Sequence, residues 1–169
     1  MGLLSSLMKK ATQPVVKVKL TEKQEETEYE RQHERMRTAE RLYGAASRKH
    51  IENTEKINTM YSVARDLQGF DGEMMEQCIA LCREDIAIAE DVKKYYGMMY
   101  GGECGYYGTF TRLAIIYEKR GEFDKAIEVC QQAIACGMDK DSNNTTIHAR
   151  MARLIKKRNN QLAKLEAGK

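Results

Sequence analysis

The sequence has very little proline and no tryptophan. Pro14 is the only proline in 169 residues, and because a proline inside a helix costs about 3 kcal/mol, this scarcity favours long uninterrupted helices. An excess of charge of one sign is also lacking, since the formal net charge is only +3. That balance does not by itself indicate nucleic acid or an acidic membrane as the partner. No apolar run is long enough to span a bilayer, so we expect no transmembrane segment.

Cysteine is present, but its pattern does not indicate a disulfide framework. The five cysteines are an odd number scattered through helical patterns, and we expect no secretory signal before them. A reducing, cytoplasmic location with free thiols acting as small apolar side chains fits this pattern. Cys78 and Cys82 have a spacing that can place two thiolates on a metal, but a zinc site needs four ligands. Burial is the favoured interpretation, and we predict neither a metal nor a cofactor.

The sequence of the N-terminal part predicts an arm followed by a helix. Residues 1–20 are expected to form an extended, poorly ordered arm, and residues 21–169 a single helical-repeat domain. Thr21 and Gln24 form a capping box at the start of the helical pattern, which continues as one helix or two to the turn residues 68–72. A row at every seventh position predicts one buried seam; its members are Tyr29, Met36, Tyr43, His50, Ile57 and Ala64.

The second half of the chain predicts four further helices around one irregular insert. Glycines interrupt the tyrosine-rich residues 95–108, which argues against regular structure there. Helices are predicted at about Glu73–Tyr96, Thr109–Arg120, Glu122–Cys136 and Thr145–Leu165.

One stretch has the requirements of two helices packed closely together. Apolar residues lie three or four apart on one face of each helix, a glycine supplies a tight break between them, and alanines let the two backbones approach. The residues that define this pattern are Phe110, Leu113, Ala114, Tyr117, Gly121, Phe123, Ala126 and Ala133.

This pattern resembles the tetratricopeptide repeat (TPR), with one clear repeat over about residues 107–140. Phe110 replaces the usual tryptophan, Cys130 an aromatic residue, and Met138 the closing proline. A degenerate repeat before it would contain Ile57 and Cys82, and a capping helix would follow at about residues 145–166. The resemblance implies an all-α fold: a short stack of antiparallel helical hairpins with a long N-terminal helix and a C-terminal capping helix.

The resemblance also implies that the first helix of each hairpin lines a concave face that can hold a peptide. The alternative is that these residues are packed under an adjacent helix. The positions concerned are Thr111, Arg112, Ile115, Glu118 and Lys119.

The tyrosines of the insert are a second candidate contact surface. Tyrosine gives a broad contact area at interfaces, although these rings can equally pack back onto the helices. They are Tyr95, Tyr96, Tyr100, Tyr106 and Tyr107.

No catalytic arrangement is predicted, because the three histidines lie on separate helical segments and no group of titratable residues converges in the sequence. We therefore expect a non-enzymatic module for protein–protein interaction or scaffolding. Its partner would be another protein, a peptide segment or a second copy of the chain in a homo-oligomer. The alternative is a nucleic-acid-associated accessory protein, whose phosphate contacts would come from the basic last helix, although those cations can also form a solvated cap. They are Arg150, Arg153, Lys156, Lys157 and Arg158.

Overall fold

The computed structural model describes residues 22–102, 107–141 and 145–168. Over these ranges the protein is all-α, which confirms the expected fold class, and the only β-type pairing described is an isolated bridge between Lys140 and Thr146. The predicted arm over residues 1–20 and the Thr21 cap lie outside the described ranges. In the part of the chain that the structure describes, no helix combines the length and apolarity that crossing a membrane requires.

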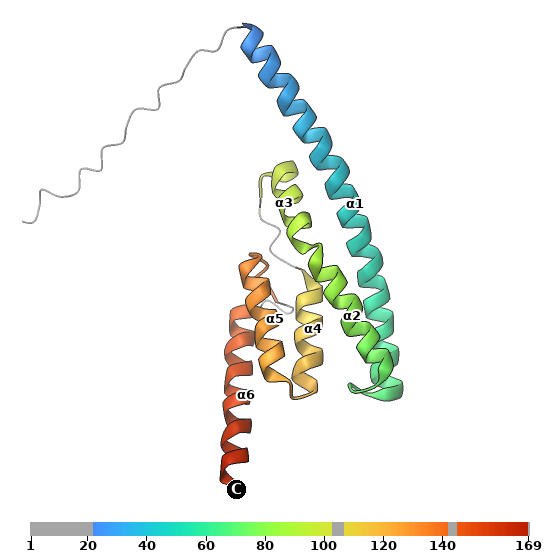
Figure 1. Cartoon of the computed structure of the whole chain (residues 1–169), viewed down its shortest axis with the longest axis vertical. Coiled ribbons are helices and arrows are strands. Elements are labelled where there is room, and N and C mark those ends of the chain that lie inside the picture. The colour runs from blue at the N-terminus through green and yellow to red at the C-terminus, as the bar shows by residue number, and fades with distance from the viewer. Residues whose placement is uncertain (1–21, 103–106, 142–144, 169) are drawn as a thin grey trace, which may run out of the picture. The chain divides into compact units, whose positions relative to one another are not determined.

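Six helices account for most of the described residues (Figure 1). The sequence predicted each of the last three to within about two residues at either end, whereas it did not predict the break after Ala87. The helices are α1 Glu22–Gln68, α2 Glu73–Ala87, α3 Ala89–Tyr100, α4 Gly108–Lys119, α5 Phe123–Ala135 and α6 Ile147–Ala167.

The chain divides into two units, residues 1–34 and 35–169. In the first unit, the described residues from 23 onward are helical and exposed. Arg31 and Glu28 form an ion pair at 3.7 Å, and the rings of Tyr29 and His33 are 5.4 Å apart. Tyr29 is 64% exposed, so the predicted seam is not buried at this position.

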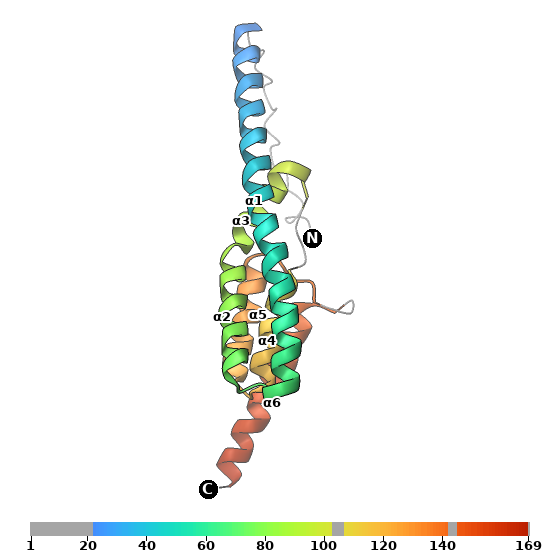
Figure 2. The same cartoon turned by 90° about the vertical axis from the view of Figure 1, so that its right-hand side faces the viewer.

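The second unit is a row of packed helices. α2 packs on α4, α4 on α5, and α5 on α6, while the C-terminal part of α1 lies along α2 (Figures 1 and 2). Ile57 and Ala64 of the predicted seam are buried here, but Leu67, which neighbours that seam, is 74% exposed. The largest fully buried apolar side chains come from α1, α2, α4, α6 and the segment after α5; they are Phe110, Ile57, Met75, Leu113, Ile116, Met138, Ile147 and Leu154.

Gly121 makes the turn between α4 and α5 possible. Its φ of +74° lies in the left-handed region, where a side chain is strained. The N–H of Glu122 donates to the carbonyl of Tyr117 at 2.9 Å, and the N–H of Gly121 donates to that of Glu118 at 3.2 Å. This double closure satisfies the last carbonyls of α4 and reverses the chain. The predicted break at Gly121 is therefore confirmed.

Arg120 ties this turn to the turn between α1 and α2. Its side chain is 6% exposed. Its Nε donates to the carbonyl of Phe70, and a terminal nitrogen donates to Glu76, each at 2.5 Å. Because both partners belong to the α1–α2 turn region, one guanidinium holds the two hairpins in register.

Two expectations about residues 73–108 are wrong. The predicted single helix from Glu73 is broken at Ile88, whose φ and ψ of −96° and −2° separate α2 from α3. Residues 95–100 of the expected irregular insert are the end of α3, which stops at Gly101 with a φ of +66°. Tyrosine and methionine side chains between the glycines supply enough apolar surface to keep this segment helical.

Replacing Ala126 by leucine tests the close approach of the helices. Ala126 is fully buried, so the added volume should lower the free energy of unfolding by about 1–3 kcal/mol through overpacking. Urea denaturation measures this value. Ala135→Leu, at an exposed position of the same helix, is the matched control and should change stability little; an equal loss in both variants would contradict the packing.

Candidate functional site

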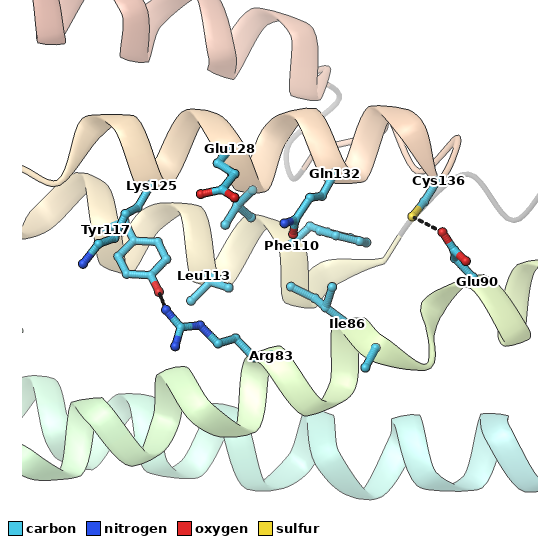
Figure 3. Close-up of a pocket in the computed structure, with 12 residues that line it drawn as sticks. Arg83, Ile86, Glu90, Phe110, Leu113, Tyr117, Lys125, Glu128, Gln132 and Cys136 are labelled. Atoms are coloured by element: carbon cyan, nitrogen blue, oxygen red, sulfur yellow. Dashed lines mark hydrogen bonds between the residues drawn. The ribbon is translucent and has the colours of Figure 1, made fainter.

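An open groove runs between α2 and α5, with α4 as its floor. Its volume is about 560 Å³. Phe110 and Leu113 of α4, which are buried, lie at its base, and Ile86 contributes a half-buried side chain (Figure 3). The lining residues are Arg83, Ile86 and Ala87 of α2, Glu90 of α3, Phe110, Leu113 and Tyr117 of α4, and Lys125, Glu128, Val129, Gln132 and Cys136 on or next to α5.

The two ends of the groove carry different charges. At one end Arg83 donates to the hydroxyl of Tyr117 at 2.6 Å, and the ammonium of Lys125 lies 5.6 Å from the centre of that ring. At the other end Cys136 donates to Glu90 at 3.9 Å (Figure 3). Burial, followed by the charge of Glu90, raises the pKa of the Cys136 thiol, which keeps it a neutral donor. Arg83 and Lys125 thus lie at one end of the groove and Glu90 at the other, and the polar side chains of Glu128 and Gln132 lie between them above an apolar base.

A buried carboxylate joins α1, α2 and α4. Asp85 of α2 is fully buried. Its oxygens accept from His50 Nδ1 at 2.9 and 3.1 Å, from Asn53 at 3.3 Å and from the hydroxyl of Thr109 at 2.5 Å. Tyr107 donates to the backbone carbonyl of Asp85 at 2.9 Å and stacks on His50 with ring centres 4.0 Å apart. These contacts replace the hydration that the carboxylate loses on burial.

A second polar network joins α4 to α6. Asp141 accepts from Thr111 at 2.8 Å and from two nitrogens of Arg150 at 2.7 and 3.2 Å. Glu118 accepts from Lys157 at 2.6 Å and lies 3.5 Å from Arg150. Burial pushes the pKa of the Glu118 carboxyl upward, but the hydrogen bond from Lys157 and the neighbouring cations outweigh it, so that this pKa lies below its ordinary value.

The predicted tyrosine surface is divided by the fold. Tyr96 and Tyr100 of α3 contact each other and Tyr43 of α1, with ring centres 4.9 to 5.9 Å apart. Tyr95 is half-buried, and Tyr100 is 61% exposed. The placement of Tyr107 on this surface is wrong, because its ring is buried against His50. Tyr106 lies outside the described residues.

The five contact positions predicted on α4 also have different environments. Thr111 is buried and bonded to Asp141, so its place among the contact positions is wrong and the packed alternative holds for it. Arg112 donates to Asn58 at 3.0 Å, and Glu118 forms ion pairs with basic side chains of α6. Ile115 is half-buried and Lys119 exposed.

Four of the five predicted phosphate-contact cations on α6 already have acidic partners. Arg150, Arg153 and Lys157 surround Glu118. Arg158 pairs with Asp124 at 3.0 Å, and Lys156 is exposed. Because these pairs join α6 to α4 and α5, they do not favour the nucleic-acid alternative, which remains a prediction.

The described cysteines are free thiols, as expected: Cys78, Cys82 and Cys130 are buried and Cys136 is half-buried. Burial raises the pKa of the Cys130 thiol to about 11, and the hydrogen bond with Cys78 together with burial raises that of Cys82. Among the residues that the structure describes, no three histidine, cysteine or acidic side chains come together to hold a metal. Cys104 lies outside those residues.

Sequence reasoning did not find the Asp85 network or the groove. One signal for the network was available, because Asp85 stands in the apolar row of α2 between Cys82 and Ala89, where a charged residue needs buried partners. Three of its partners, Thr109, Asn53 and His50, lie 24 to 35 residues away from Asp85 along the chain. Spacing within one helix could not identify them.

No protein-family model, curated protein or solved structure matches this chain.

Replacing Asp85 by asparagine tests the buried network. The amide keeps the shape but offers one accepting oxygen where several donors converge, so the free energy of unfolding should fall by about 1–3 kcal/mol. Urea denaturation measures the change. Glu84→Gln, at the exposed neighbouring position, removes the same charge and should have little effect; equal losses in the two variants would show that burial of the carboxylate is not the cause.

Glu118 should contribute to stability only above acidic pH. Because its pKa is lowered in the folded chain, the contribution is complete above the unfolded value of 4.5 and is lost as pH falls through the folded value. Comparing the wild type with Glu118→Gln by urea denaturation at about pH 7 and at about pH 3 should show a stability difference that shrinks at the lower pH. A difference that stays constant would contradict this linkage.

Proposed function

We propose that this chain is a non-enzymatic, TPR-like helical-repeat protein that binds a segment of another protein. The observation that carries the proposal is the groove of about 560 Å³ between α2 and α5. Ligand sites in proteins are typically concave and apolar with a few placed polar groups, and this groove has that composition.

The order of the helices supports a repeat architecture. The end of α1 and α2 form one hairpin, α4 and α5 form a second, and α6 packs on α5. The contact positions Ala114, Ala126 and Ala133 are fully buried, which lets the helices approach as repeat packing requires. In this proposal α6 is the capping helix and the α1–α2 hairpin is the degenerate repeat.

The chemistry of the groove indicates what kind of segment fits. Its apolar base favours apolar side chains, and its ends favour an acidic group beside Arg83 and a basic group beside Glu90. We therefore propose an amphipathic peptide segment with opposite charges at its two ends. The free thiols of the described cysteines support a reducing, cytoplasmic environment for this encounter.

Ala87→Arg tests the groove without disturbing the core. Ala87 is exposed and lines the groove, so a long side chain should block the partner while the helix remains intact. Affinity purification from the native host, followed by mass spectrometry, should recover a partner with the wild type and lose it with Ala87→Arg.

The matched control is Ala80→Arg, at an exposed alanine of α2 that does not line the groove. It should retain the partner, and circular dichroism should show equal helicity in both variants. Tyr100→Ser probes the tyrosine cluster of α3. Loss of the partner with Tyr100→Ser but not with Ala87→Arg would overturn the groove and locate the contact on α3.

A further inference from the structure

A second, smaller cavity lies between α1 and the first turns of α4. Its volume is about 280 Å³, and none of its lining residues is acidic. Two of them, His50 and Arg112, can carry positive charge, and Thr54, Asn58 and Thr109 add polar side chains. It shares no lining residue with the groove between α2 and α5. A cavity with this lining favours an anion over a cation or an apolar group.

His50 is fixed in orientation by the contacts of one ring nitrogen. Nδ1 faces the buried carboxylate of Asp85 at 2.9 Å, and the ring stacks on Tyr107. Because a carboxylate accepts, Nδ1 carries a proton, and the second nitrogen, Nε2, is left for a ligand. Nε2 has no partner in the described part of the chain.

Arg112 is also held in place before any ligand binds. One terminal nitrogen donates to Asn58 at 3.0 Å, and the guanidinium lies over the ring of Tyr61, 4.1 Å from its centre. A guanidinium has five N–H donors in a planar fork, so the contact with Asn58 leaves donors for an oxyanion. A preorganised cation loses little side-chain entropy when it binds.

We propose that this cavity binds a phosphate group through Arg112 and Nε2 of His50. Neutral His50, protonated on Nδ1, has an accepting Nε2, which a carboxylate or a sulfate cannot satisfy at neutral pH because neither carries a proton. A hydrogen phosphate can donate its P–OH to Nε2 while its other oxygens accept from Arg112. The proposal is independent of the peptide groove.

Titration with inorganic phosphate at low ionic strength, followed by calorimetry, tests this site. The wild type should show saturable binding, and Arg112→Gln should weaken it about tenfold or more. Lys119→Gln, an equal charge change at an exposed position of the same helix, is the matched control and should leave binding unchanged. Absence of saturable binding, or equal weakening in the two variants, would overturn the proposal.

Two further measurements establish the role of His50 and the class of phosphate. The ¹⁵N signal of His50 Nε2 should shift on titration, which remains a test even if His50→Gln unfolds the chain; no shift would overturn the contact. Sulfate should bind more weakly, and equal affinity for sulfate would overturn the assignment to phosphate. O-phosphoserine carries little P–OH at neutral pH, because its second pKa is about 6, so it should bind more weakly than inorganic phosphate; equal or tighter binding would overturn the P–OH contact with Nε2.

Discussion

The arrangement of α1, α2 and α4 depends on one buried carboxylate. Taking the charge of Asp85 out of water is unfavourable by several kcal/mol, and only donors from the neighbouring helices compensate for it. These donors are His50 and Asn53 of α1 and Thr109 of α4. Because each donor must reach the same two oxygens, sliding any helix by one residue would leave the carboxylate unsatisfied. The network thus selects one register where apolar packing alone would accept several.

This register places two different surfaces on α4. Phe110 and Leu113 face the groove between α2 and α5, whereas Thr109 and Arg112 face the cavity beside α1. The two residues of each pair are three positions apart and so share a face of the helix. The second pair is shifted by one position from the first, which places it on the adjacent face. One helix therefore contributes both to the groove that we propose for a peptide and to the cavity that we propose for a phosphate group.

The sequence predicted the local features well where one physical cause dominated. The α4–α5 hairpin followed from its alanines and from Gly121, because backbone conformation and close approach are decided by residue type. The glycines around Tyr95–Tyr100 predict an irregular insert, but these residues are helical. Tyr107 and Thr111 are candidate contact residues with packing as the alternative, and both are packed, because each has a hydrogen-bond partner outside its own helix, Asp85 and Asp141 respectively.

The sequence by itself determined that the described chain is helical and where its tightest turn lies, since helix periodicity, scarce proline and a glycine turn act over a few residues. Only the tertiary structure decided which polar groups are buried together, which cations of α6 are paired, and where the groove and the cavity open. The physical reason is that a hydrogen bond or an ion pair between distant residues leaves no periodic trace in either helix. Asp85 stands in an apolar row of its own helix, and what surrounds it is set by packing.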